Sequence, residues 1–376
     1  KYVSDQVTDC DFSGYADLTD DVLTSKVPTD LVETTVNWLE ETQEKAREHT
    51  PLIDLTPYPP TLRTDTYLET TEYVEFNGKK LLTVVTTPAN CLKQTPVYIL
   101  GNTGGYDHRG GLGRESVEAA RKLALAGVAS IRFDDENTGD SYPDLPTGQE
   151  ILYSEDSIQN LERIIDFACS KFDGPLTLVG RCSSAYAAFH AAARDERVKQ
   201  LVLVNQLKFI WDKDVPNELK NMMTRSGGEY KKRLADPQIV RRILKGDVDL
   251  LAAGLGVSRV VLKRVSEKTA DYFPKVTKFG RLKLEALNLF KILNDRNVPV
   301  HFLCSIGDGS IEELKAHFGP DLQKMPAYRN ITYTTVEDAD HRLMPVHGRN
   351  AFIDLLVRTS EKQQPSTPSS QQPNAA

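Results

Sequence analysis

From residue 66 onward, short apolar segments alternate with longer helical patterns, and this alternation most constrains how the chain can fold. Strands are expected at Val97–Leu100, Ala129–Phe133, Leu176–Val179, Leu201–Val204, Val300–Cys304 and Ile331–Val336. Helices are expected between and after them, at Arg114–Leu125, Ser154–Lys171, Ser184–Arg194, Leu282–Asp295 and His347–Arg358. Apolar strands that alternate with helices predict an α/β protein with a doubly wound, mostly parallel sheet.

A hairpin is expected to lead into this sheet. Tyr67–Phe76 and Lys80–Thr87 flank the dipeptide Asn77-Gly78, which is a strong signal for a two-residue turn. The first strands should therefore form an antiparallel edge on an otherwise parallel sheet.

Composition and charge exclude several classes of protein. Apolar residues make up 40 % and charged residues 26 % of the 376, as in ordinary globular chains. The formal net charge of −7 gives no indication of nucleic-acid binding. The sequence contains no run of 18 apolar residues, so no membrane-spanning helix is predicted. No secretory signal pattern opens the sequence, so we expect a cytoplasmic protein. The sequence does not indicate an oligomeric state.

The five cysteines are widely spaced and form no Cys-x-x-Cys pair, so neither a zinc site nor a disulfide framework is expected. Four of them are expected to be small buried apolar groups, namely Cys10, Cys91, Cys169 and Cys304.

Cys182 is the exception, because it lies between an apolar strand and a helix of small residues, in the segment Gly180-Arg-Cys-Ser-Ser184. This is the small-x-nucleophile-x-small pattern of a sharp strand-to-helix turn. A nucleophile at Ser183 would place Arg181 where the turn requires a small residue, so the spacing selects Cys182. The helix that follows would favour the thiolate. The alternative is a cysteine packed in an ordinary turn.

A base and an orienting acid are expected downstream, in the order nucleophile, acid, histidine. Asp308 comes just after the strand Val300–Cys304, and His341 comes just after the strand Ile331–Val336. Both residues therefore fall at the sheet edge where Cys182 is expected.

Several other groups compete with this assignment. Three carboxylates lie too near His341 in sequence to be the first choice, namely Glu337, Asp338 and Asp340. Three further histidines fall on helical stretches and are expected at the surface, namely His49, His190 and His317.

Acyl chemistry also needs donors for a developing oxyanion. One donor is expected to be the backbone N–H of Ser183, and the other that of Thr103 or Asn102 in the glycine-rich loop after Val97–Leu100. The residues after this loop could line the mouth of a substrate pocket or could cap and pair locally. They are His108, Arg109 and Arg114.

Residues 206–281 interrupt the alternation of strands and helices and are helical by pattern. They hold 17 basic against 9 acidic residues, and we expect them to form a cap over the sheet edge. The surplus charge is either a solvated helical face or a surface that receives an anionic substrate or carrier.

The other divisions of the chain follow from this interruption. We expect an N-terminal arm over 1–60 with a helix near Leu31–His49, and core segments over 61–205 and 282–359. The Ser/Gln/Pro-rich residues 360–376 are expected to be a disordered tail.

Across about residues 66–359 the chain resembles the α/β-hydrolase superfamily. The resemblance rests on Gly180-x-Cys182-x-Ser184, the Gly101–Gly104 loop, the Phe133–Ser141 segment, Asp308 and His341. Within the superfamily the chain resembles the bacterial serine-aminopeptidase-like branch, including hydrolases found with exopolysaccharide and exosortase systems. Cys182 replaces the usual Ser, and Ser184 replaces the usual Gly. Dienelactone hydrolases of the superfamily also use Cys, so the first change is compatible with catalysis but does not imply peptidase activity.

The predicted activity is hydrolysis of an ester, lactone or thioester through an acyl-enzyme at Cys182, with His341 as base and Asp308 as its partner. One alternative is an acyltransferase that moves an acyl group to a polysaccharide or a carrier-bound acceptor. Another is a non-catalytic binding or scaffold protein of the same fold. The expected partner is a small-molecule or carrier-bound acyl substrate, anionic if the cap receives it, and not nucleic acid. Neither a metal nor an organic cofactor is needed.

Overall fold

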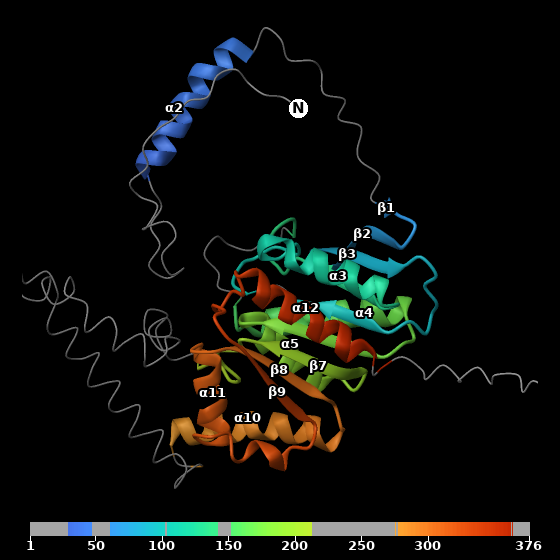
Figure 1. Cartoon of the computed structure of the whole chain (residues 1–376), viewed down its shortest axis with the longest axis vertical. Helices are drawn as coiled ribbons and strands as arrows, with labels where there is room; N and C mark the ends of the chain where they lie inside the picture. The colour runs from blue at the N-terminus through green and yellow to red at the C-terminus, as the bar shows by residue number, and fades with distance from the viewer. Residues whose placement is uncertain are drawn as a thin grey trace, which may run out of the picture. The chain divides into compact units, whose positions relative to one another are not determined.

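The computed structural model describes residues 29–46, 61–101, 104–141, 152–212, 275, 277–361 and 363 (Figure 1). The chain divides into two compact units, Lys1–Pro59 and Pro60–Ala376. In the first unit, helix α2 covers Thr29–Ala46, close to the predicted Leu31–His49. Its Val32, Val36 and Leu39 are exposed.

The second unit is built on one nine-stranded sheet. Its strands are β1 (Thr61–Arg63), β2 (Tyr67–Phe76), β3 (Lys79–Pro88), β4 (Val97–Leu100), β5 (Ala129–Phe133), β6 (Leu176–Arg181), β7 (Val198–Val204), β8 (Val300–Ser305) and β9 (Ile331–Val336). Their order across the sheet is β1-β2-β3-β5-β4-β6-β7-β8-β9. In this order, β1, β2, β3 and β5 pair antiparallel with one another. All neighbours from β5 through β4 to β9 pair parallel.

The predicted fold class is confirmed, since this mostly parallel sheet has the arrangement of the α/β-hydrolase fold. The leading hairpin is present as well, and Asn77 and Gly78 take positive φ values of 47° and 78° at its turn. The short edge strand β1 lies outside the elements that the sequence predicted.

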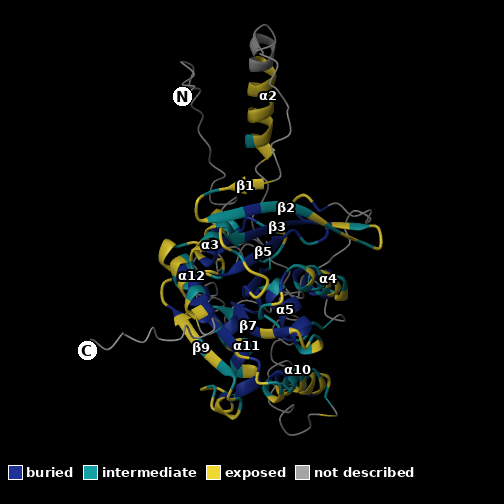
Figure 2. Cartoon of the chain, turned by 90° about the vertical axis from the view of Figure 1, so that its right-hand side faces the viewer, coloured by how far each residue is buried: buried dark blue, intermediate teal, exposed yellow. Residues whose placement is uncertain are grey.

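Helices cover both faces of the sheet. They are α3 (Glu115–Leu125), α4 (Glu155–Lys171), α5 (Ser183–Arg194), α10 (Lys278–Asp295), α11 (Gly309–Phe318) and α12 (Val346–Glu361), with short 3₁₀ turns at Leu112–Arg114 and Met325–Ala327. Successive residues of a strand point to opposite faces. Val97 and Ile99 therefore join a buried cluster with α4, α5 and α10, whereas Tyr98 and Leu100 join one with α3 and α12. Figure 2 shows the central strands buried between these layers.

The parallel strands end at one edge of the sheet, and this edge positions the site. Cys182 directly follows β6, Asp308 follows β8 by three residues, and His341 follows β9 by five residues. Because β6, β7, β8 and β9 pair in that order, these three loops lie at neighbouring strand ends.

Two histidines are buried, and their predicted surface position is wrong. His190 and His317 are only 6 % and 9 % exposed. The Nε2–H of His190 donates to the carbonyl of Phe209 at 2.8 Å, and the Nδ1–H of His317 donates to the carbonyl of Glu313 at 2.9 Å. Burial lowers the pKa of both imidazoles. Helical periodicity could not show this, because the residues that cover them come from other parts of the chain.

Most of the predicted cap lies outside the described residues, which stop at Asp212 within it and resume at Lys275 and Thr277. The division at 281 and the role of the cap stay predictions, and α10 begins before that position, at Lys278. The tail from residue 364 is also outside the described part, whereas α12 continues to Glu361. None of the described helices is long and apolar enough to cross a bilayer.

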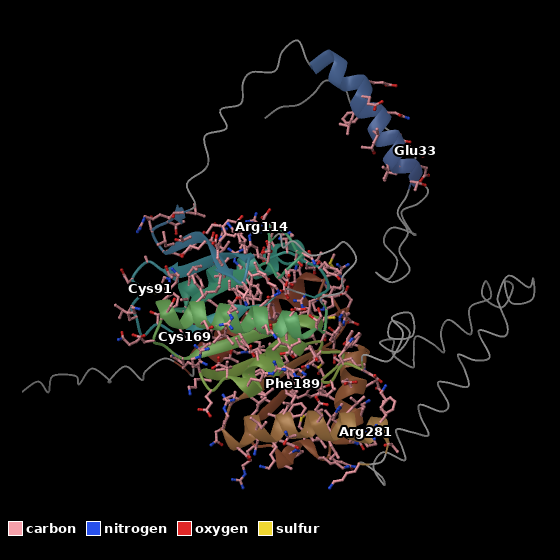
Figure 3. The ribbon with its side chains drawn as sticks, turned by 180° about the vertical axis from the view of Figure 1, so that it is seen from behind. Glu33, Cys91, Arg114, Cys169, Phe189 and Arg281 are labelled. Atoms are coloured by element: carbon pink, nitrogen blue, oxygen red, sulfur yellow. The ribbon has the colours of Figure 1, made fainter. Side chains whose placement is uncertain are left out.

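Phe209 lies at the centre of an aromatic cluster and is fully buried. Its ring neighbours are Phe189 (labelled in Figure 3), Phe290, Phe302 and His317, with ring centroids 4.9–5.9 Å away. We expect Phe209→Ala to lower the free energy of unfolding by about 3–5 kcal/mol, because the lost ring leaves a cavity. Urea unfolding followed by circular dichroism measures this. The control Leu92→Ala removes a side chain that is 69 % exposed, and should change stability by less than about 0.5 kcal/mol. Equal effects of the two substitutions would contradict the packing.

Candidate active site

Cys182 occupies the sharp turn between β6 and α5. Its backbone has φ 52° and ψ −115°, a conformation that costs a residue other than glycine on the order of 1–3 kcal/mol. Gly180 makes the turn possible, because a Cβ there would lie 2.5 Å from the carbonyl oxygen of Ser184. The backbone of Gly104 also passes close to the turn, because a Cβ added at Gly104 would lie 2.8 Å from the Cβ of Cys182. The turn presents the Cys182 side chain half-buried at the sheet edge.

The two serines after Cys182 hold the turn together. The Ser184 hydroxyl accepts from the backbone N–H of Arg181 at 3.0 Å and donates to the carbonyl of the same residue at 3.2 Å. The Ser183 hydroxyl accepts from the N–H of Gly105 at 3.2 Å, and Ser183 is 7 % exposed. Both hydroxyls are therefore engaged in holding backbone, and half-buried Cys182 is the candidate nucleophile of the turn.

Asp308 and His341 lie in contact. The Nδ1 of His341 is 2.8 Å from Oδ2 of Asp308. The other oxygen of Asp308, Oδ1, accepts from the N–H of Ser310 at 2.9 Å, which caps helix α11. Both oxygens of this carboxylate are thus fixed, and with Nδ1 donating to Asp308, Nε2 is the ring nitrogen left for chemistry.

The backbone around His341 is held by three donors. Each donor binds one of three consecutive carbonyls, at 2.8 Å from Ser305 Oγ to Asp340, at 2.9 Å from Asn205 Nδ2 to His341, and at 2.8 Å from Arg181 Nη1 to Arg342. The donors come from the ends of β8, β7 and β6. The position of the histidine is therefore set by the same strand ends that carry the rest of the site.

Arg181 and Asn205 are themselves buried and fixed. Arg181 pairs with Glu115 at 2.7 Å, and its guanidinium lies 5.5 Å from the centre of the Phe352 ring. Asn205 accepts from the N–H of Ser305 at 2.8 Å. Neither residue was predicted from the sequence to have a role in positioning. The available signal was that polar Asn205 and Ser305 directly end two apolar strands.

The thiol and the imidazole bias each other toward a charged pair. Burial alone would raise the pKa of Cys182, but the positive charge of His341 outweighs burial and holds this pKa below its ordinary value. Burial alone would lower the pKa of His341, but Cys182 and Asp308 raise it to about 10. The Nε2 atom of His341 has no conventional hydrogen-bond partner among the described residues, so attraction between charges, rather than a short hydrogen bond, couples it to the sulfur. Asp308 keeps a lowered pKa despite burial, because His341 faces it.

Of the expected oxyanion donors, only Ser183 lies within the described residues. Its N–H lies at the start of helix α5, where backbone amides have no partner in the helix, and it helps to lower the pKa of Cys182. Asn102 and Thr103 lie outside the described part of the chain. The described glycines on either side of them, Gly101 and Gly104, approach Ser184 and Cys182 closely.

The three residues considered for a pocket mouth differ in their surroundings. Arg109 binds Asp134 and pairs with Asp140 at 2.7 Å, which matches the alternative of local pairing. His108 is exposed, and its Nδ1 accepts from the N–H of Gly110 at 3.0 Å. Arg114 is exposed at the start of α3, with φ 66° (Figure 3).

Tyr153 is a candidate functional residue that no sequence pattern indicated. Its hydroxyl oxygen lies 3.6 Å from the sulfur of Cys182. The residue precedes Ser154, whose side chain caps α4, and it belongs to no periodic pattern. Nothing in the sequence therefore indicated that it reaches Cys182.

A pocket opens beside the turn between β6 and α5. Its wall includes Gly105, Leu152, Val179, Ser183 and Ala187, so apolar side chains lie next to the turn. Within the residues that the structure describes, no group of three or more His, Cys, Asp or Glu side chains is arranged to hold a metal ion.

Comparison with known proteins finds similarity of structure only. The sequence matches no protein-family model and no curated protein. Similar solved structures include Est1E from Butyrivibrio proteoclasticus with ferulic acid bound (15 % identity, TM-score 0.48, 78 % of this chain and 98 % of that chain). They also include a dienelactone hydrolase from Anabaena variabilis (11 %, 0.45, 80 % and 100 %) and an α/β serine hydrolase homologue from Coxiella burnetii (14 %, 0.43, 79 % and 98 %). Likeness at this level does not extend to activity or substrate.

The charged pair predicts the pH dependence of alkylation at Cys182. Because His341 lowers the pKa of this thiol, iodoacetamide should alkylate Cys182 with a midpoint below the ordinary thiol pKa of about 8.5. His341→Ala should move the midpoint to higher pH, since the thiolate loses its cationic partner. Masses of the peptides that contain each cysteine measure this. Cys169, whose pKa is raised by burial, serves as the internal reference. An unchanged midpoint in His341→Ala would contradict the coupling.

Proposed function

We propose that the protein is a cysteine-dependent hydrolase of ester, lactone or thioester bonds that acts through an acyl-enzyme at Cys182. One observation carries the proposal: a strained cysteine with a lowered pKa faces a histidine whose Nδ1 lies 2.8 Å from Asp308. A nucleophile, a base and an orienting carboxylate in this arrangement are what acyl transfer requires.

In the first half-reaction the Cys182 thiolate attacks the carbonyl carbon of the substrate. A sulfur–carbon bond forms, and the electron pair of the carbonyl moves onto its oxygen. The N–H of Ser183 and the expected donor at Thr103 or Asn102 stabilise this oxyanion, each by about 3 kcal/mol of the barrier. Collapse of the intermediate expels the alcohol or thiol, which takes its proton from Nε2 of His341.

In the second half-reaction water hydrolyses the thioester. Neutral His341 removes a proton from the water through Nε2 as the oxygen attacks the carbonyl carbon. Collapse breaks the sulfur–carbon bond, releases the acid, and returns Cys182 as a thiolate beside protonated His341. Asp308 stabilises the imidazolium of this resting pair and holds the ring by Nδ1 throughout.

We infer an anionic acyl group or carrier from the predicted cap, because residues 206–281 hold 17 basic against 9 acidic residues. Salt should weaken the attraction between such a surface and an anionic ester. We therefore expect the Michaelis constant for an anionic ester to rise with sodium chloride, while that for a neutral ester of the same length stays constant. Equal responses of the two esters would exclude recruitment by charge.

A pre-steady-state burst tests the acyl-enzyme. With p-nitrophenyl acetate we expect a burst of p-nitrophenol and an intact mass increased by one acetyl group, because the thiolate keeps the acyl group until water attacks. Cys182→Ala should lose both signals, and Cys169→Ala should keep both. An adduct that persists in Cys182→Ala would remove this residue from the mechanism.

The decay of the adduct then separates hydrolysis from transfer. Hydrolysis predicts a decay rate that added alcohols leave unchanged. Faster decay with formation of a new ester would instead assign an acyltransferase.

A further inference from the structure

The phenol of Tyr153 lies directly against the reacting sulfur. Its oxygen is 3.6 Å from Sγ of Cys182, within the range of hydrogen bonds to sulfur, and the residue is 9 % exposed.

Two aromatic rings from distant segments fix the Tyr153 ring. Trp211, which follows β7, stacks on it with centroids 4.1 Å apart and planes at 5°. Tyr186 of helix α5 meets it edge-on, with centroids 5.4 Å apart and planes at 67°. The position of the Tyr153 hydroxyl is therefore set by packing on two sides.

The backbone of Tyr153 is strained in the same place. Its φ of 57° is unfavourable for a bulky side chain. Such conformations persist where the surrounding structure enforces them, and they concentrate at functional sites. Ring contacts with Trp211 and Tyr186 surround the side chain at this strained position.

The electrostatics fix the direction of the hydrogen bond. Burial raises the pKa of Tyr153 well above its ordinary value, and the charge of Cys182 raises it further. The phenol thus stays protonated wherever Cys182 ionises, so it is the donor and the sulfur is the acceptor.

We propose that Tyr153 is a catalytic residue that donates a hydrogen bond to the Cys182 thiolate and so holds the sulfur charged and aimed before substrate binds. The inference rests on the proposed acyl chemistry at Cys182. The sulfur loses its charge on acylation and regains it when the acid leaves, so the same hydroxyl assists Cys182 as a leaving group.

Tyr153→Phe tests the proposal, because it removes the hydroxyl and keeps the ring between Trp211 and Tyr186. We expect the midpoint for alkylation of Cys182 by iodoacetamide to rise by about one pH unit, since a bond to a charged acceptor is lost. We expect the plateau rate at high pH to rise about threefold, since a more basic thiolate is the stronger nucleophile. Thiolate absorbance in the ultraviolet gives the midpoint independently.

Tyr186→Phe is the matched control, because it removes a phenol hydroxyl from a ring that contacts Tyr153. We expect its midpoint to stay at the wild-type value. Thermal unfolding of both variants checks that the ring packing survives. An unchanged midpoint in Tyr153→Phe would overturn the proposal. A fall of about a hundredfold in ester turnover with an unchanged midpoint would also overturn it, and would assign Tyr153 to the oxyanion instead.

These outcomes are separable from failure of the proposed function. Alkylation needs only a thiolate and iodoacetamide, whose iodide leaves as the sulfur–carbon bond forms. A midpoint that shifts in Tyr153→Phe, in a protein that forms no acyl adduct, would support the contact and reject the esterase. An acyl adduct together with an unchanged midpoint in Tyr153→Phe would support the esterase and reject Tyr153 as the donor to the thiolate.

Discussion

The parallel pairing of β6, β7, β8 and β9 is the constraint on which the site depends. Parallel strands end at the same edge, so residues far apart in sequence meet there without any long excursion of the chain. Cys182, Asp308 and His341 each follow one of these strands. A shift in the pairing of β8 with β9 would separate the carboxylate from the imidazole, because each is carried by only one of the two.

Support for the histidine is built into the same edge. The donors on the carbonyls of residues 340–342 are side chains at the ends of β6, β7 and β8. The loop after β9 is therefore fastened to all three neighbouring strands through its backbone. The position of the imidazole is therefore fixed through backbone carbonyls, which accept hydrogen bonds from side chains of the neighbouring strand ends.

Much of the fold and the outline of the site could be predicted from the sequence. The alternation of strands and helices gave the mostly parallel sheet, and Asn77-Gly78 gave the hairpin. Cys182, Asp308 and His341 could be selected because a parallel sheet gathers strand ends, which makes the position after a strand informative. The structure adds the distance of 2.8 Å between Nδ1 of His341 and Oδ2 of Asp308, which spacing along the sequence cannot give.

The parts that could not be predicted depend on contacts between distant segments. The ring of Tyr153, whose hydroxyl lies beside Cys182, packs against Trp211 and Tyr186, and none of the three lies in a pattern that relates it to the others. The buried imidazole of His190 finds its hydrogen-bond partner in the carbonyl of Phe209, which belongs to another segment. Local pairing of Arg109 could be proposed from the sequence but not chosen, because the choice depends on where the loop carrying Asp134 lies.

Asp308 serves two structures with its two oxygens. Oδ1 caps the start of helix α11, and Oδ2 orients His341. A substitution at this position therefore disturbs two contacts at once. Glutamate could reach the imidazole in some geometries, but its longer side chain is a poor fit for a helix N-cap. Exchange of aspartate for glutamate here would therefore weaken the start of α11 by about 1 kcal/mol even if the imidazole kept its carboxylate partner.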